Sequence, residues 1–187
     1  GIYKDTWIYA NESPAMEFKV IENMWNISKD LELTNDQNKD LDALLLKRQG
    51  GDVGLIKIDV SGNSGFLDKL FDQPTAVYYP NVFWDLTAIG KETIFETIKD
   101  SILYLVDWFS KNPQYNLVIK PHPDEMNKLL PETKYSVQSV IQDYVGNLPK
   151  NITYLDHAIK IPAFELYLRS NVSISWCGTP GMESVVY

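Results

Sequence analysis

Four short apolar runs alternate with segments of helical periodicity from residue 76 onward, and this alternation constrains the fold more than any other feature of the chain. The runs lie at 76–79, 116–119, 152–155 and 172–176. They are largely apolar along their length, which is typical of strands that are covered on both faces. Strands that alternate with helices form parallel sheets. The sequence therefore predicts an α/β fold with a Rossmann-like parallel sheet and helices on both faces.

The segments between the runs carry the signals of helices. Apolar residues recur at helical spacing from Ile94 to Phe109 and again from Val137 to Val145. Gly146 and Pro149 are expected to end the second of these helices, and Pro162 is expected to begin a third. Every pair of consecutive strands is thus joined by a helix.

Residues 1–70 differ from residues 71–187 in that they contain an acidic, Asn-rich stretch and no apolar run of this kind. Ser13-Pro14 is expected to begin one helix, and Thr34 to cap another that stops at Gly50-Gly51. We expect residues 1–70 to be a helical connector or the remnant of a preceding domain, with the boundary near Phe71. The last residues have the character of a helix start, so we expect the Rossmann-like domain to be truncated at its C-terminus.

The charge balance argues against nucleic acid as a partner. The chain has 25 acidic and 17 basic residues, a formal net charge of -8, and no run of Lys and Arg that could bind a phosphate backbone. Its apolar runs are far shorter than the roughly 20 residues that cross a bilayer. The single cysteine, Cys177, permits no internal disulfide, as is usual in a reducing compartment. We therefore expect a cytoplasmic protein.

Ligands of open parallel sheets bind beyond the carboxyl ends of the strands, so the loops that follow the four runs are the informative ones. They cover residues 80–85, 120–125, 156–157 and 177–184, and they are polar, aromatic and rich in Gly or Pro. Such loops suit a small polar ligand. The alternative for any one loop is that Pro and Gly end a strand and Asp caps a helix.

The loop after the last run is chemically the most specific. A strand that leads through Gly178-Thr179-Pro180-Gly181 into a helix offers backbone N–H groups to an anion, and the two glycines allow close approach. We interpret this turn as a phosphate seat. Glu183 is expected either to bind ribose hydroxyls or only to favour the dipole of the helix start. The loop matches neither a P-loop nor a G-x-G-x-x-G dinucleotide motif.

Lys120-Pro121-His122-Pro123 holds an imidazole between two prolines at a strand end. His122 is expected to bind a phosphate oxygen or to act as general acid or base, with Lys120 adding positive charge. His157 is interpreted as a surface loop residue.

Two other constellations are disfavoured. Cys177 with a histidine would make a hydrolase dyad, but nothing marks this cysteine as activated. His122 with Asp124 and Glu125 would make a metal site, but no second, well-spaced histidine accompanies it.

Segments 79–85, 117–123 and 173–183 resemble, in this order, the C-terminal half of bacterial capsule polysaccharide biosynthesis glycosyltransferases, including Kdo transferases of the GT-B type. The most specific element is the Lys-Pro-His-Pro strand end followed later by a serine-rich strand, a Gly-rich turn and a glutamate. The resemblance covers about residues 71–187.

This resemblance implies two Rossmann-like domains, of which the C-terminal one holds a nucleotide-sugar donor such as CMP-Kdo, with no cofactor and no metal. The acceptor would be a glycan or glycolipid, and the full-length protein would associate peripherally with the inner face of the cell membrane. His122 would contact the donor phosphate and be the catalytic residue, and Glu183 would hold the ribose. The candidate donor-binding residues are Asn81, Asp85, Lys120, His122, Ser175, Gly178, Thr179, Gly181, Glu183 and Ser184.

Two rival functions stay open at this point. A nucleotide-sugar epimerase of the same architecture would convert a UDP-sugar without an acceptor. A non-catalytic nucleotide- or sugar-binding module would be favoured if the gene encoded this domain alone.

Overall fold

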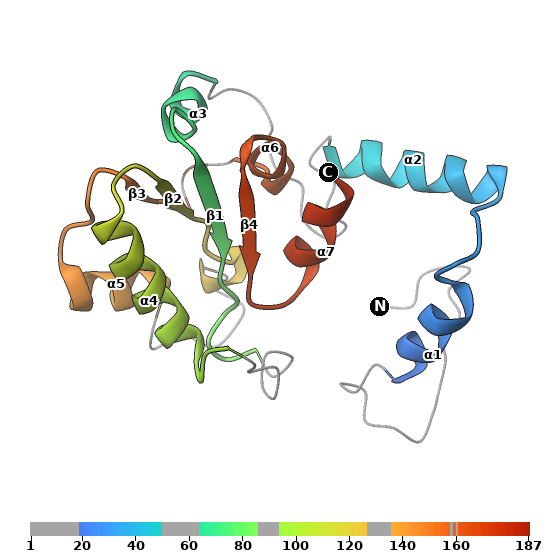
Figure 1. Cartoon of the computed structure of the whole chain (residues 1–187), viewed down its shortest axis with the longest axis horizontal. Coiled ribbons are helices and arrows are strands. Elements are labelled where there is room, and N and C mark those ends of the chain that lie inside the picture. Colours follow the sequence, from blue (N-terminus) through green and yellow to red (C-terminus); the bar gives the residue numbers. More distant parts are fainter. Residues whose placement is uncertain (1–18, 50–63, 86–93, 127–135, 158, 160) are drawn as a thin grey trace. The chain divides into compact units, whose positions relative to one another are not determined.

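Four parallel strands form one sheet in the computed structural model, which describes residues 19–49, 64–85, 94–126, 136–157, 159 and 161–187 (Figure 1). The strands are β1 (Thr75–Tyr79), β2 (Asn116–Ile119), β3 (Ile152–Tyr154) and β4 (Val172–Ser175). All three pairings, β1 with β2, β1 with β4 and β2 with β3, are parallel. The predicted α/β class and parallel sheet are confirmed.

The strand order is β3-β2-β1-β4. The chain therefore builds outward from β1 through β2 to β3, and then returns to place β4 on the opposite side of β1. Strand order reverses between β1 and β4, and in open α/β sheets a crevice forms at the carboxyl ends of the strands on either side of such a reversal. The strand order therefore places the candidate ligand-binding crevice at this edge of the sheet.

Helices α4 (Ile98–Lys111) and α5 (Val137–Val145) cover one face of the sheet (Figure 1). The helix expected from Ile94 begins four residues later, because the hydroxyl of Thr97 accepts a hydrogen bond from the N–H of Asp100 at 3.0 Å and so caps the helix at Ile98. Ile94 lies outside α4 and is 84% exposed. The core on this face consists of Ala76, Tyr78, Ile98, Ile102, Leu105, Val106, Phe109, Leu117, Ile119, Val137, Val140, Ile141 and Ile152.

Both ends of α5 are set by local sequence. Ser136 and Ser139 form a reciprocal capping box, and Gly146 ends the helix with a φ of 67°. The predicted stop at Gly146 is confirmed.

Replacing Gly146 with Ala is expected to lower the free energy of unfolding by about 1–2 kcal/mol, because a side chain is strained at this φ even though nothing lies within 4 Å of the added Cβ. Gly65→Ala is the matched control: it lies in a helix with equally open surroundings and no positive φ, so it is expected to stabilise by up to about 1 kcal/mol. Urea unfolding of the two variants measures both effects. Equal free energies of unfolding would contradict a strained backbone conformation at position 146.

Helices α3 (Ser64–Leu70), α6 (Ala163–Arg169) and α7 (Thr179–Val186) supply the other helical elements of the sheet unit. The core on this second face contains Leu67 and Leu70 of α3 and Leu166 and Tyr167 of α6, together with Val77, Tyr79, Val118, Leu155 and Ile161. Helices therefore cover both faces, as predicted, and α6 begins after Pro162 as expected.

The compact unit that holds the sheet runs from Ala43 to Tyr187, and residues 1–42 form another unit. This differs from the expected boundary near Phe71. The change in composition along the sequence puts the boundary too far toward the C-terminus, because α3, which precedes Phe71, buries Leu67 and Leu70 in the core beneath the sheet. Two leucines in a seven-residue helix give too short a pattern to mark it as part of the domain.

The remaining helices are α1 (Lys19–Ser28) and α2 (Asn35–Gln49). Thr34 caps α2 as predicted: its hydroxyl accepts from the N–H of Gln37, and its own N–H donates to Oε1 of Gln37 at 2.9 Å. The expected start at Ser13-Pro14 and stop at Gly50-Gly51 lie outside the described residues. Among the helices that the structure describes, none combines the length and apolar character that a membrane span requires.

Candidate functional site

A cavity of about 580 Å³ opens at the carboxyl edge of the sheet. It receives residues from the loops after all four strands, as the sequence predicts. From these loops it is lined by Asn81 and Asp85 after β1, Lys120 and His122 after β2, Asp156 and His157 after β3, and Cys177, Gly178, Thr179 and Glu183 in the segment after β4. Ser175, Gly181 and Ser184, three of the candidate donor-binding residues, do not line it.

The β4–α7 turn contains the two glycines expected to approach a ligand, and the structure separates their roles. Gly178 lines the cavity with a φ of 104°, a conformation that favours glycine, and is the N-cap of α7. Gly181 lies inside the first turn of α7, where an added Cβ would stand 3.4 Å from the side chain of Ser175. Gly181 does not line the cavity, and its missing side chain lets the helix pack closely on β4.

Ser184 and Ser175 also serve the packing of α7. The hydroxyl of Ser184 donates to the carbonyl of Gly181 at 3.1 Å, a bond internal to the helix. The hydroxyl of Ser175 is buried beneath Gly181 and has no hydrogen-bond partner among the described residues. Neither hydroxyl reaches the cavity, so the turn offers Gly178 and Thr179 to a ligand.

Glu183 lines the cavity, but not from the first turn of α7, which contains no acidic residue. The interpretation as a dipole-stabilising carboxylate at the helix start is therefore wrong. Its Oε2 accepts a hydrogen bond from the hydroxyl of Tyr167 at 3.2 Å, and its Oε1 lies 2.9 Å from a guanidinium nitrogen of Arg48. Sequence reasoning missed both partners because they come from α6 and α2, far from Glu183 along the chain.

Aromatic side chains make one wall of the cavity, and sequence reasoning missed them as well. Tyr79, Phe164, Tyr167 and Tyr187 all line it, and the rings of Tyr167 and Tyr187 stack at an interplanar angle of 11°. The hydroxyl of Tyr79 is buried and has no hydrogen-bond partner among the described residues. Burial raises the pKa of Tyr79, so its hydroxyl is neutral and able to donate. The only signal in the sequence is that Tyr79 ends an apolar run.

Asn81 joins the loops on the two sides of the β1–β4 reversal. Its Nδ2 donates to the carboxylate of Asp85 at 2.8 Å and to Sγ of Cys177 at 3.2 Å, and its Oδ1 accepts from the N–H of Val82 at 2.8 Å. The residue is 5% exposed. Since both polar atoms of the amide already have protein partners, Asn81 shapes the crevice by holding its two sides together.

Lys120 reaches across the loop after β3. Its Nζ donates to the carbonyl of Ile161 at 2.9 Å, and burial lowers the pKa of Lys120 to about 8. At neutral pH the ammonium is still mostly protonated, because the surrounding pH stays below that value. It therefore supplies a positive charge to a largely apolar part of the cavity.

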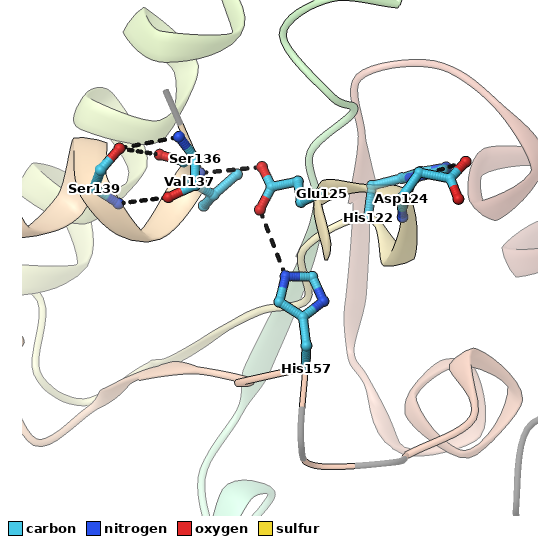
Figure 2. A network of polar contacts seen from close by, with 7 residues as sticks. All are labelled: His122, Asp124, Glu125, Ser136, Val137, Ser139 and His157. Carbon is cyan, nitrogen blue, oxygen red and sulfur yellow. Dashed lines mark hydrogen bonds and ion pairs between the residues drawn. The ribbon is translucent and has the colours of Figure 1, made fainter. Parts of the chain in front are cut away.

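His122 is held by its own loop, which continues into a short 3-10 helix, Pro123–Met126 (Figure 2). Its Nδ1 accepts a hydrogen bond from the N–H of Asp124 at 3.2 Å and lies 3.8 Å from the Asp124 carboxylate. Burial lowers the pKa of His122, while Asp124 and Asp85 oppose this shift. The imidazole is thus mostly neutral at pH 7 with its proton on Nε2, which leaves an N–H donor for a ligand.

The interpretation of His157 as a surface loop residue is wrong. Its side chain is only 20% exposed, lines the cavity, and places Nε2 3.6 Å from Oε2 of Glu125 (Figure 2). The Glu125 side chain is 1% exposed, and its Oε1 accepts from the N–H of Val137 at 3.1 Å. Glu125 escaped sequence reasoning because it stands 32 positions before its histidine, at no motif spacing.

The disfavoured metal constellation is not assembled. Glu125 turns toward α5 and His157, whereas Asp124 stays beside His122 (Figure 2). Over the parts of the chain that the structure describes, no three His, Cys, Asp or Glu side chains are grouped as ligands of one ion.

The cavity thus brings together cations, imidazoles, an N-cap glycine and a carboxylate at one sheet edge. Comparison of the chain with models of protein families, with curated proteins and with solved structures found no match.

Proposed function

We propose that this chain is the donor-binding domain of a metal-independent GT-B glycosyltransferase, which transfers a sugar from a nucleotide-activated donor to a glycan or glycolipid in capsule or lipopolysaccharide assembly. The observation that carries the proposal is a cavity to which the loops after all four strands contribute. Its volume of about 580 Å³ lies in the range of sites that enclose small ligands. The sequence resemblance adds the sugar chemistry, with CMP-Kdo as one candidate donor, and a site of action at the cytoplasmic face of the membrane.

In this proposal the donor phosphate sits against the start of α7. Gly178 and Thr179 bring the first N–H groups of the helix to the cavity wall, where an anion is favoured by the free donors and by the dipole. Lys120 lines the same cavity and adds positive charge, whereas the charge of Arg48 is paired with Glu183. The ribose hydroxyls would bind Glu183, whose carboxylate is already oriented by Tyr167.

His122 would act on the leaving nucleotide. Its Nε2–H donates to a phosphate oxygen as the bond from the anomeric carbon to the phosphate oxygen breaks and the nucleotide departs with the electron pair. A preorganised donor at the site where negative charge develops lowers the barrier to this step. The bond from the Asp124 N–H to Nδ1 keeps the proton on the nitrogen that this role needs.

The proposal predicts that at least one of CMP, UDP, GDP and CDP binds the chain and raises its melting temperature, because a ligand of the native state alone stabilises that state. Isothermal titration calorimetry would then compare that nucleotide with its 2′-deoxy form. Wild type is expected to prefer the ribose form, and Glu183→Gln to lose the preference. Glu165→Gln in α6, outside the cavity, is the control and should keep it. Binding of none of the four nucleotides would contradict the proposal.

A further inference from the structure

Behind His157, at the end of the cavity formed by the loops after β2 and β3, lies a buried carboxylate that the proposed donor contacts do not use. One oxygen of Glu125 is accounted for by the N–H of Val137, the first residue of α5. The other, Oε2, is buried, has no hydrogen-bond partner among the described residues, and points to Nε2 of His157 (Figure 2). A buried carboxylate oxygen is costly unless a donor satisfies it.

His157 is the donor that the arrangement offers. The separation of 3.6 Å between Nε2 and Oε2 is longer than a hydrogen bond, and catalytic contacts of this kind are often long before a ligand binds. With Nε2–H directed at the carboxylate, the free lone pair of the neutral ring is on Nδ1, which points away from Glu125 (Figure 2). Because His157 lines the cavity, that lone pair is available to a ligand.

The surroundings of the pair keep the imidazole neutral, so that it can accept a proton. Burial, Lys120 and His122 all lower the pKa of His157, and only Asp156 raises it. Burial raises the pKa of Glu125 to about 7, and Tyr154 is the further titratable group close to that carboxylate. Glu125 therefore loses its proton near neutral pH, where the His157 imidazole is already neutral, and a carboxylate beside this ring can stabilise an imidazolium.

We infer that His157 accepts the proton of a hydroxyl that enters the cavity at the β3 end, and that Glu125 is the positioning residue that fixes its ring. The inference rests on the proposed function, which supplies the reaction. The hydroxyl oxygen forms a bond to the anomeric carbon, the bond from that carbon to the phosphate oxygen breaks, and the nucleotide leaves with the electron pair. The hydroxyl proton passes to Nδ1 of His157. With water as the acceptor, the same step is hydrolysis of the donor.

Imidazole nitrogen spectra test the pair without any ligand, since the chain has only two histidines. In protein labelled with ¹⁵N-histidine, and with the signals assigned through His122→Asn, neutral His157 is expected to carry its proton on Nε2. Glu125→Gln should weaken the preference for a proton on Nε2, because an amide at this position can also donate to that nitrogen. Glu96→Gln, at an exposed glutamate, should leave it unchanged. A proton on Nδ1 in wild type, or a proton preference that does not change in Glu125→Gln, would overturn the inference.

Donor hydrolysis tests the reaction. UDP-glucose, GDP-mannose and CMP-N-acetylneuraminic acid serve as probes, and released nucleotide is measured by chromatography. His157→Gln is expected to lower release of nucleotide by at least about 100-fold while nucleotide affinity stays within about twofold of wild type. Glu125→Gln keeps a carbonyl for the Val137 N–H, so it serves as the second variant if His157→Gln does not fold, and it should lower release about 10-fold or more.

The outcomes separate the two ideas. If nucleotides bind and both variants release nucleotide at the wild-type rate, or if wild type releases none, the proton-accepting role is wrong and the donor site stands. If no nucleotide binds but the nitrogen spectra show the coupled pair, the proposed function is wrong, while a proton-accepting His157 is supported for another hydroxyl ligand.

Discussion

Glu125→Gln is expected to make the protein more stable than wild type at pH 8 and about equally stable at pH 5. Burial raises the pKa of Glu125 from an ordinary value of 4.5 to about 7, so the native state binds this proton more tightly than the unfolded state does. The stabilising effect of protonation is fully present below pH 4.5 and is lost as the pH rises to about 7. Between pH 5 and pH 8 the wild type would lose roughly 2–3 kcal/mol in this way, which the neutral amide would not lose.

Urea unfolding of wild type and variant at pH 5, 6, 7 and 8 measures the effect. The relevant quantity is the difference between the two free energies of unfolding, since other groups titrate in both proteins. Glu96→Gln provides the background, because that glutamate is exposed. If the curves for Glu125→Gln and wild type ran parallel over this range, Glu125 would not be the buried acid described above.

His122→Ala is expected to weaken binding of the preferred nucleotide by about 1.5–3 kcal/mol, or roughly 10- to 150-fold, if the imidazole makes a charge-assisted bond to phosphate. Burial lowers the pKa of His122, and a bound phosphate favours the protonated ring. Affinity of the wild type should therefore fall as the pH rises through the range just below and around 6.5. In His122→Ala the part of this pH dependence that comes from the imidazole should be absent.

Calorimetry of both proteins between pH 5 and 8 checks the assignment. The phosphate itself titrates near pH 6, so the difference between wild type and variant isolates the contribution of His122. A purely structural histidine would give the reverse pattern, with a lower melting temperature and an unchanged affinity. Parallel pH profiles would remove His122 from the donor site.

Much of the fold follows from local sequence. Buried parallel strands need continuous apolar runs, and such runs can be read within four or five residues. Caps are equally local, as Thr34, Pro162 and Gly146 demonstrate. The helix start was predicted too early because Ile94 continues the apolar period one turn before α4. The hydroxyl of Thr97 caps the helix and sets its start at Ile98.

The site, like the fold, was predictable only where local sequence determines it. Residues that follow strands, such as Lys120, His122 and Gly178, could be predicted to reach the cavity because topology alone brings strand ends to one edge. The residues that contact them and set their chemistry could not be predicted from the sequence. Glu125 reaches His157, and Arg48 reaches Glu183, only through packing of elements distant in sequence. Gly181 has the composition of a ligand loop, yet the close approach of α7 to Ser175 accounts for it.

The amide of Asn81 makes the identities of two positions interdependent. Its Nδ2 donates both to Asp85 and to Cys177, so each of these two positions needs a side chain that can accept a hydrogen bond. An aspartate at position 81 would set two carboxylates against each other and leave the sulfur without its donor. We therefore expect substitutions at positions 81 and 85 to occur in pairs. A single substitution at either position should open the crevice between β1 and β4 before it disturbs the sheet itself.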